Sequence, residues 1–228
     1  MPRARKKPVP KEAAGPCPKA VGRLSLYRRV LRELLSGGTA NIYSHQLAEA
    51  VGSSPAQVRR DLMHLGYRGH PHSGYDVRKL AQSIDDCLDA QGGQRVGLVG
   101  VGHLGSALAG RFAGGGSKLE LVAAFDNDPR KQGMKIGDCR VRPVESMAEV
   151  VRAQHIGIAI IAVPASEAQA AADACTEAGV RGILNFAPVP VRVPEGVYVL
   201  NVDLTMALET VAFFARRDKQ STNTVSGA

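Results

Sequence analysis

The first third of the chain carries apolar residues at helical spacing. In residues 24–36 an apolar stripe is followed by Gly37 and Gly38, a common way for a helix to end. The stripe consists of Leu24, Tyr27, Leu31, Leu34 and Leu35. A shorter helix is predicted over about residues 45–51, with Ser44 as its N-cap. These segments predict a small helical core in the first third of the chain.

A third helix is predicted over about residues 55–65. Ser54 and Gln57 form a capping box, with proline at the first helical position between them. Its buried stripe consists of Val58, Leu62 and Leu65. Arg59 and Arg60 cannot lie on that stripe, so they are predicted to point outward.

Residues 66–69 and 73–77 then predict a small β-hairpin. Two short helices joined by a tight turn, followed by a hairpin, indicate a winged helix-turn-helix domain. The first turns of such a second helix enter the major groove of DNA, where long donors reach base edges or phosphates. The candidate DNA-binding residues are Ser44, Ser54, Gln57, Arg59, Arg60 and Tyr75. A helical bundle used for protein contacts is the alternative.

From about residue 92 the pattern changes to short apolar runs that alternate with helical segments. Strands are predicted over residues 94–101, 119–125, 155–163, 182–186 and 197–202, with helices after residue 103 and over about 167–177. Such alternation is typical of a Rossmann-type doubly wound parallel sheet. The predicted fold class is therefore α/β, with the winged helix-turn-helix domain first and the parallel-sheet domain second.

A final helix, predicted over residues 204–217, is too apolar for a free surface. Its stripe consists of Leu204, Leu208, Val211 and Phe214, so it must be buried against its own domain or a partner chain. The predicted division of the chain is a basic disordered tail (1–19), a winged-helix domain (20–82), a Rossmann domain (83–203), the C-terminal helix (204–217) and a mobile tail (218–228).

The charge of the chain is concentrated in its first third. Residues 1–82 hold 15 Lys/Arg and 5 Asp/Glu, whereas the rest of the chain is slightly acidic and the whole of its 228 residues carries a formal +8. An excess of this kind is the electrostatic footprint of a protein that binds a polyanion. It therefore supports DNA as the partner of the first domain.

Other features exclude several classes of protein. The four cysteines are scattered without a Cys-x-x-Cys pair, which favours a reducing compartment and argues against a disulfide framework. The longest apolar runs are too short to cross a bilayer, so a cytoplasmic protein with no membrane partner is expected. His70 and His72 lack an evident third ligand, and no metal site is predicted.

A glycine-rich turn follows the first predicted strand of the sheet and opens a helix. Gly100 allows the tight turn, Gly102 lets the backbone approach a pyrophosphate, and Gly105 lets helix and strand pack closely. Val101, His103 and Leu104 complete this turn. Asp126 ends the next strand, where its carboxylate is expected to accept hydrogen bonds from the adenosine ribose. With Lys131 nearby, these residues predict a site for NADH or NAD⁺.

Two further strand ends fall on the ligand edge of the predicted sheet. Pro164 follows one strand, and Asn185 and Phe186 end another, so all three are candidate cofactor-binding residues. Asn185 has two equally supported roles, which are donating a hydrogen bond to the nicotinamide carboxamide and capping the turn at its strand end.

Several motifs together resemble one bacterial family. The runs SPAQVRRDLMHLG, GVGHLGSAL, FDNDPRK, IIAVPASEAQAAAD, AGVRGILNFAPV and NVDLTMALE occur in order between about residues 20 and 217. They are similar to those of the redox-sensing transcriptional repressor family Rex. The resemblance implies a homodimer that binds a palindromic operator, holds NADH or NAD⁺ in its Rossmann domains, exchanges its C-terminal helix between subunits, and releases DNA when the NADH/NAD⁺ ratio rises.

The resemblance also implies a set of switch residues, and here the chain departs from the family. An Asp matching Asp203 pairs alternatively with an Arg matching Arg29 and with a Tyr, whose position is taken here by Arg111. A permanent cation at that position is expected to hold Asp203 whatever the nicotinamide state. The wing carries Pro71 and His72 where the family commonly has Arg-Gly.

Two other functions remain open at this point. The first is an NAD-dependent oxidoreductase with an N-terminal regulatory module, although no nucleophile–base pair is evident and the residues after position 82 are few for two domains. The second is a DNA-binding regulator whose nucleotide is structural, or is replaced by a coenzyme A-like molecule.

Overall fold

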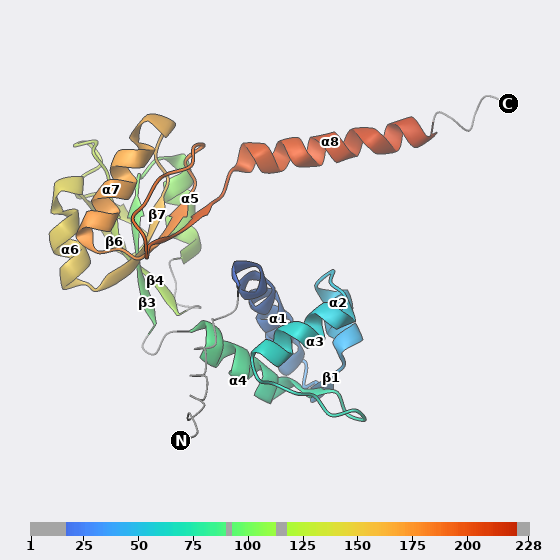
Figure 1. Ribbon diagram of the computed structural model, residues 1–228. Coiled ribbons are helices and arrows are strands. Elements are labelled where there is room, and N and C mark those ends of the chain that lie inside the picture. Colours follow the sequence, from blue (N-terminus) through green and yellow to red (C-terminus); the bar gives the residue numbers. More distant parts are fainter. Residues whose placement is uncertain (1–16, 90–92, 113–117, 223–228) are drawn as a thin grey trace, which may run out of the picture. The chain divides into compact units, whose positions relative to one another are not determined.

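The computed structural model describes residues 17–89, 93–112 and 118–222, with side chains described as far as residue 216. Residues 1–16 of the predicted basic tail (1–19) and the last residues, 223–228, lie outside this range. The chain divides into two compact units, Met1–Ala90 and Gln91–Ala228. Figure 1 shows the helices and strands of both units. Buried apolar residues form separate clusters in the two units.

The first unit is mainly helical. Its elements are α1 (Pro18–Ser36), β1 (Asn41–Ile42), α2 (Ser44–Ala50), α3 (Pro55–His64), β2 (Tyr75–Asp76) and α4 (Val77–Leu88). The residues of the predicted stripes fill its core, with Leu24, Tyr27, Leu31, Val58 and Leu62 almost completely buried. The pattern of apolar positions therefore predicted both the helices and the faces that they bury.

Helix α1 starts earlier than the sequence indicated. It begins at Pro18, which has the fixed backbone angle that suits the first turn of a helix, and Ala20 is buried. The predicted disordered tail (1–19) therefore reaches two residues too far.

Helix α4 corrects the predicted domain boundary at residue 82. The helix runs through that boundary, and Leu80 and Ile84 are both fully buried in the core of the first unit. Ion pairs fasten its end to α1: Arg32 binds Asp85 at 3.1 Å, and Arg28 binds Asp89 at 2.7 Å and Asp85 at 3.6 Å. The whole of α4 thus belongs to the first unit.

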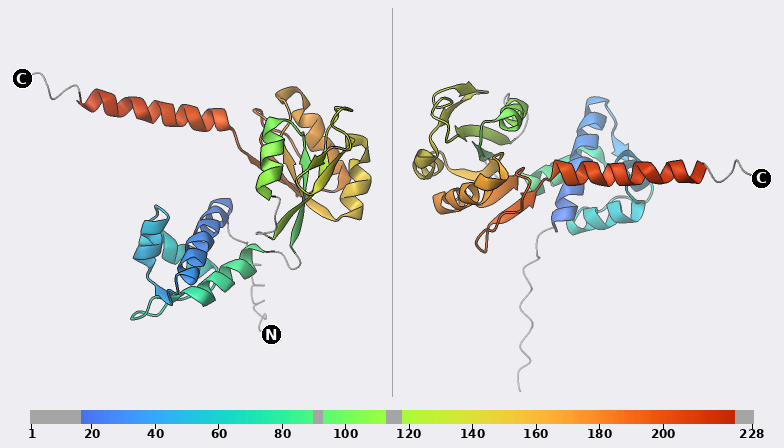
Figure 2. Two further views of the ribbon diagram at one scale, coloured as in Figure 1. Left: turned by 180° about the vertical axis from the view of Figure 1, so that it is seen from behind. Right: turned by 90° about the horizontal axis from the view of Figure 1, so that it is seen from above.

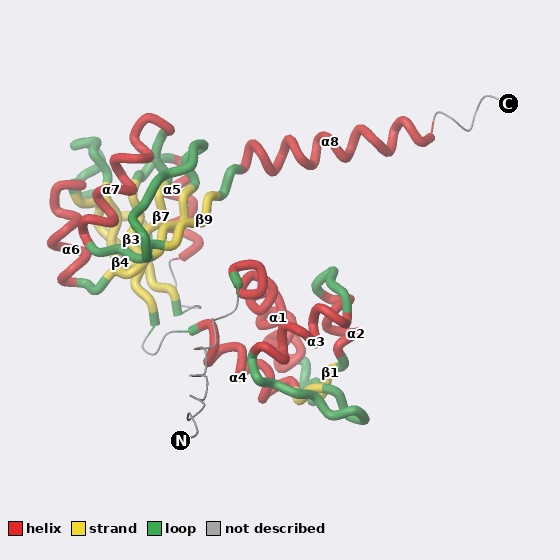
Figure 3. Tube along the Cα trace, in the orientation of Figure 1, coloured by secondary structure: helices red, strands yellow, loops and turns green. Residues whose placement is uncertain are grey.

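The wing also differs from the predicted hairpin. Strand β2 pairs antiparallel with β1, and residues 66–69 are not its partner. A single bridge between His70 and Gly74 closes the wing, which Figure 3 shows as a loop.

The second unit is built on a seven-stranded sheet. Its strands are β3 (Gln94–Val99), β4 (Leu119–Phe125), β5 (Lys135–Ile136), β6 (Cys139–Arg142), β7 (Ile156–Ile161), β8 (Gly182–Asn185) and β9 (Tyr198–Asn201). They lie in the order β5-β6-β4-β3-β7-β8-β9, and every neighbouring pair is parallel except β5 and β6. This is the predicted doubly wound sheet, with a short antiparallel edge added.

Helices cover both faces of the sheet (Figure 2). They are α5 (His103–Phe112), α6 (Met147–Ala153) and α7 (Ala168–Ala178), and two short 3₁₀ turns precede α6 and α7. Alternation along β3 separates two cores, because Leu98 packs on the α5 side and Val99 packs on the α6–α7 side.

Two cysteines belong to these cores and pack as small apolar residues. Cys139 is buried on the α5 side and its thiol donates to the Leu121 carbonyl at 3.1 Å, while Cys175 is completely buried against α6 and β7. Burial raises the pKa of the Cys175 thiol to about 12, and burial together with nearby acidic charge raises the pKa of Cys139. Cys17 and Cys87 are exposed, and all four thiols are free.

The C-terminal helix α8 (Leu204–Thr222) is longer than the predicted 204–217 and enters part of the predicted mobile tail. Its apolar stripe is exposed: 70% of Leu208, 64% of Val211 and 57% of Phe214 are accessible to solvent. Burial against its own domain, one of the two expected possibilities, is therefore not what the chain adopts by itself. No helix in the described ranges is long and apolar enough to cross a membrane.

The corrected boundary gives the first prediction. Ile84→Ala is expected to destabilise the first unit by about 2–5 kcal/mol, because it leaves a cavity where α4 meets the other helices. Urea unfolding followed by circular dichroism measures this loss. Cys87→Ala, an exposed change on the same helix, should alter the free energy of unfolding little. If Ile84→Ala left the urea midpoint of unfolding unchanged, the assignment of α4 to the first unit would be wrong.

Candidate functional sites

Helix α3 begins with the predicted cap, although one half of the predicted capping box is absent. Ser54 Oγ accepts a hydrogen bond from the backbone N–H of Gln57 at 3.2 Å. The Gln57 side chain does not return to the cap, because its amide donates to Asp61 Oδ1 at 2.9 Å. Gln57 is half-buried, which corrects its predicted role as an exposed donor for DNA.

Asp61, which the sequence analysis missed, fixes α3 against α1. Its carboxylate is 2% exposed and accepts two hydrogen bonds from the Arg23 guanidinium, at 2.6 and 2.7 Å. Tyr27 Oη donates a third at 2.9 Å. A buried carboxylate bound in this way joins the two helices by charge-assisted hydrogen bonds. An acidic residue on a basic helix was the available signal, but its partners on α1 lie more than 30 positions away.

These contacts displace two pKa values. Burial raises the pKa of Asp61, but the hydrogen bonds from Arg23, Tyr27 and Gln57 outweigh it, and the pKa lies below its ordinary 3.8. Burial and the Asp61 carboxylate raise the pKa of Tyr27 to about 12. The cluster is thus an ionised carboxylate facing a cation and a neutral phenol at neutral pH.

Arg59 and Arg60 are exposed on α3, as predicted. Arg59 Nη1 donates to Ser44 Oγ at 3.0 Å, so a serine of α2 orients the first of the two arginines. Ser44 is the first residue of α2 and does not cap it, which corrects its predicted place. The residue before it is Tyr43, whose N–H donates to Gln46 Oε1 at 2.8 Å.

Tyr75, predicted to bind DNA, lies largely inside the first unit. It is 8% exposed and packs in the core, with its ring centroid 6.2 Å from that of Tyr67. Burial raises its pKa. From its sequence position, an aromatic residue beside the wing can either contact DNA or pack in the core. Tyr75 pairs with Ile42 of β1 and packs in the core.

The glycine turn between β3 and α5 has the geometry that its sequence predicts. Gly100 has φ +93°, and a Cβ there would lie 2.5 Å from the Ala162 carbonyl oxygen. A Cβ on Gly105 would collide with the Gly100 carbonyl, whereas one on Gly102 would meet nothing within 4 Å. Gly100 and Gly105 therefore allow close packing, and Gly102 leaves open space toward a ligand.

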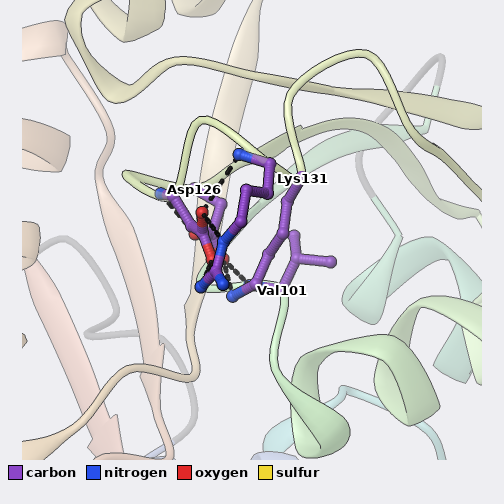
Figure 4. Close-up of polar contacts among 5 residues, drawn as sticks. Val101, Asp126 and Lys131 are labelled. Carbon is purple, nitrogen blue, oxygen red and sulfur yellow. Dashed lines mark hydrogen bonds and ion pairs between the residues drawn. The ribbon is translucent and has the colours of Figure 1, made fainter.

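Asp126 lies at the end of β4 beside this turn (Figure 4). Its Oδ2 accepts from the Val101 N–H at 2.7 Å and from Lys131 Nζ at 2.9 Å, and its Oδ1 accepts from the Asp128 N–H at 2.8 Å. Burial raises the pKa of Asp126, but these three hydrogen bonds lower it by more than burial raises it, so the carboxylate stays ionised. One acceptor position of Oδ1 is left for a ribose hydroxyl among the contacts that the described residues make.

A cavity of about 380 Å³ opens at the carboxyl ends of β3, β4 and β7. Of the predicted cofactor residues, Gly100, Gly102, Asp126, Lys131 and Pro164 line it. Residues that were not predicted as cofactor-binding also line it, among them Asn127, Asp128, Val144 and Glu167. Val101, His103, Leu104 and Gly105 belong to the turn but are not among the lining residues. The cavity therefore lies at the edge of the sheet where a ligand was predicted to bind.

Asn185 and Phe186 do not line this cavity. Asn185 is completely buried, and its amide donates to the Val189 carbonyl and to Asn201 Oδ1, each at 2.8 Å. Its Oδ1 accepts from the Ala187 N–H at 3.0 Å. Of its two expected roles, capping the strand-end turn is the one observed. Phe186 packs on the α5 side of the sheet.

The three predicted switch residues have separate surroundings in this chain. Asp203 Oδ1 accepts from the Met206 N–H at 2.9 Å and so caps α8. Arg111 is exposed in the last turn of α5, and Arg29 is exposed on α1. Within the described ranges no ion pair joins Asp203 to Arg111, and no cluster of three potential metal ligands occurs.

Comparison with known proteins decides the family. A model described as "Putative DNA-binding protein N-terminus" matches residues 18–62, and one described as "CoA binding domain" matches residues 93–189. A protein of Chloroflexus aurantiacus named Redox-sensing transcriptional repressor Rex is 40% identical over 201 residues, which cover 88% of this chain and 94% of that protein. The chain belongs to the Rex family.

Other members give the same result. The Rex repressor of Rhodopirellula baltica is 43% identical over 195 residues, 85% of this chain and 82% of that protein. The crystal structure of RSP in complex with beta-NAD+ and operator DNA has 31% sequence identity and a TM-score of 0.82, covering 92% of this chain and 97% of that one. The crystal structure of RSP in complex with beta-NADH has 31% sequence identity and a TM-score of 0.80, covering 92% of this chain and 98% of that one. The fold and the order of the two units are those of Rex.

The Asp61 cluster predicts an acid-sensitive component of stability in this Rex protein. Asp61→Asn is expected to cost about 3 kcal/mol at pH 7, because it leaves the Arg23 charge without its partner; Arg23 is partly exposed, which keeps the loss at the low end for such pairs. Because the folded pKa of Asp61 is lowered, its stabilisation is complete above about pH 4 and is lost as the pH falls through the folded value.

Urea unfolding between pH 7 and pH 3 measures both effects. The wild type should lose more stability than Asp61→Asn below pH 4. Asp86→Asn, an exposed carboxylate of α4, serves as the matched control. If acidification lowered the free energy of unfolding of Asp61→Asn and of the wild type by the same amount, the ionised Asp61 carboxylate would not be the source of the acid-sensitive stability.

Proposed function

We propose that this protein is a transcriptional repressor that binds operator DNA as a homodimer and leaves it when the NADH/NAD⁺ ratio rises. One observation carries the proposal: a capped helix with exposed Arg59 and Arg60 and a cavity beside the Gly100–Gly105 turn occur in one chain of the Rex family. The solved RSP complexes with beta-NAD+ and operator DNA and with beta-NADH support both ligands.

In the proposed complex, the first turns of α3 enter the major groove. Arg59 and Arg60 supply charge and donors for base edges and phosphates. The Asp61 cluster holds the helix from below while these side chains stay exposed. Tyr75 and the Gln57 side chain have structural roles instead.

The cavity is proposed to hold NADH or NAD⁺. The N–H groups at the start of α5 would bind the pyrophosphate, and Gly102 would let it approach the backbone. The ionised Asp126 would accept a ribose hydroxyl and repel a 2′-phosphate, favouring NAD(H) over NADP(H). Lys131 is already paired with Asp126, so its charge offers little compensation for a 2′-phosphate.

Helix α8 is the proposed dimer element. Six large apolar side chains of this helix are more than half exposed: Leu204, Met206, Leu208, Val211, Phe213 and Phe214. Burial of such side chains contributes about 1.5–3 kcal/mol each, which a second subunit would supply. Exchange of the helix between two subunits satisfies this need and, with two winged domains, matches a palindromic operator.

Coupling between the two ligands is proposed to involve Asp203. This carboxylate caps α8, so a change in its partners would act on the dimer element directly. Arg111 replaces a residue that can lose or gain a hydrogen bond, and its permanent charge is expected to weaken the difference between NADH and NAD⁺.

A dehydrogenase is the alternative of another class. Such an enzyme needs an acid or base beside the transferred hydride. The described residues that line the cavity include no histidine, their one lysine is bound to Asp126, and Asp128 is paired with Arg130, so Glu167 is the carboxylate left as a candidate acid or base. A cavity of this make-up favours a regulator.

The decisive experiment is operator binding titrated with NADH and with NAD⁺ at one fixed salt concentration. NADH should weaken operator binding at least 10-fold more than NAD⁺ does, corresponding to a coupling of about 1.4 kcal/mol or more. Asp126→Ala should shift both nucleotide curves to higher concentration without changing DNA affinity in the absence of nucleotide. If the two nucleotides had identical effects on operator binding, the protein would bind DNA with a structural nucleotide and would not sense the NADH/NAD⁺ ratio.

The role of Arg59 can be separated into base reading and phosphate contact. If Arg59 reads a guanine edge, Arg59→Ala should cost about 1–3 kcal/mol on the operator and relax specificity at one position. A phosphate contact would instead weaken binding to all sequences and reduce the salt slope by about one. Titrations against operator and scrambled DNA at several salt concentrations distinguish these results. Arg140→Ala, an exposed arginine of the sheet domain, is the matched control and should change neither quantity.

A further inference from the structure

Tyr43 contacts the wing, although it lies in the turn before α2. Its phenolic Oη donates to the His72 carbonyl oxygen at 2.9 Å. Its ring stacks on the imidazole of His45, with centroids 5.6 Å apart and an interplanar angle of 18°. Some 40% of Tyr43 remains exposed. The side chain therefore lies on the surface and is held at both ends.

The next residue in the chain contacts the other DNA-facing element. Ser44 Oγ accepts from Arg59 Nη1 of α3 at 3.0 Å. Tyr43 and Ser44 are consecutive residues. Tyr43 thus binds the tip of the wing, and Ser44 binds Arg59, the first exposed arginine of α3. Their backbone is itself fixed, because the Tyr43 N–H donates to Gln46 Oε1 and the Leu47 N–H donates to the Tyr43 carbonyl.

The base of the wing is held by the backbone, and its tip is not. His70 and Gly74 exchange two hydrogen bonds, at 2.7 and 2.9 Å, and Gly74 packs so closely on β1 that a Cβ would lie 2.5 Å from the Ile42 carbonyl oxygen. Pro71, His72 and Ser73 extend beyond this bridge and are exposed. The Tyr43 hydroxyl supplies a hydrogen bond to the middle of that tip.

We propose that Tyr43 is a positioning residue of the DNA-binding site, which holds the tip of the wing at a fixed distance from Arg59. The inference rests on the proposed DNA binding and adds a residue to it. Because Tyr43 bonds to the His72 carbonyl, the His72 imidazole remains free to donate to acceptors in the minor groove, where bases present mainly acceptor atoms. Tyr43 acts through the wing and does not itself read bases.

Tyr43→Phe tests this directly, since it removes one hydroxyl and keeps the ring that stacks on His45. It should weaken operator binding about 3- to 10-fold, the effect of one net hydrogen bond. The salt slope should stay the same because no charge is lost. Discrimination between A·T and G·C pairs should fall at the positions under the wing and persist at those under α3. Tyr43→Leu, which also removes the ring, should lose at least as much.

Two controls separate positioning from general stability. Tyr67→Phe is the matched change in the same unit, since its hydroxyl lies 3.5 Å from the Asp76 carbonyl oxygen at the base of the wing, and it should leave affinity and discrimination unchanged. His72→Ala removes the side chain that Tyr43 positions and keeps the carbonyl to which it bonds. In that background Tyr43→Phe should cost less than twofold.

The outcomes are distinct. Wild-type affinity and discrimination in Tyr43→Phe, with DNA binding otherwise intact, would refute the positioning role alone. An equal loss with and without the His72 side chain would assign Tyr43 to the stability of the domain and equally refute it. Failure of the wild type to bind operator DNA would refute the proposed function itself.

Discussion

The orientation of α3 depends on one buried carboxylate. Asp61 is inside the first unit, where an unpaired charge would be costly, and donors from α1 and from α3 itself satisfy it. Apolar packing alone would permit α3 to slide or rotate against α1, because Leu and Val side chains fit in several ways. Directional bonds from Arg23 and Tyr27 select one arrangement, and that arrangement leaves Arg59 and Arg60 on the outside.

The sheet domain uses the same principle at its ligand edge. Asp126 is bonded to the N–H of Val101, so the end of β4 fixes the turn that follows β3. Gly100 and Gly105 then allow α5 to approach the strands. In both units an ionised aspartate therefore joins neighbouring elements, and the groups left free around it form the binding surface. A nucleotide that bonds to Asp126 must share it with Lys131 and the turn, which links occupancy of the cavity to the geometry of α5.

The sequence predicted the elements better than the individual roles. The stripe of α3, the Ser54 cap and the glycine turn followed from local spacing, and the structure has all three. Tyr75, Gln57 and Asn185 were assigned to ligands because each has suitable chemistry, but each is bonded or packed inside the protein. Gln57 bonds to Asp61 one turn further along its own helix, Asn185 caps the turn at its own strand end, and Tyr75 packs through the unpredicted pairing of β1 with β2. Residue type alone does not show which of several available partners a polar side chain takes. The boundary at residue 82 failed for a related reason, since the stripe of α4 continues across it and only its burial against α1 shows where the unit ends.

The two buried cysteines have a consequence for a protein of a redox-sensing family. Peroxide and disulfide exchange attack the thiolate, and a thiol such as Cys175, with a pKa of about 12 and no solvent access, is almost never in that form. The cores of the sheet are therefore insulated from oxidants. Oxidants are therefore not expected to modify these two thiols in the folded domain, so a response to the redox state that involves the interior of the sheet domain would depend on a bound small molecule.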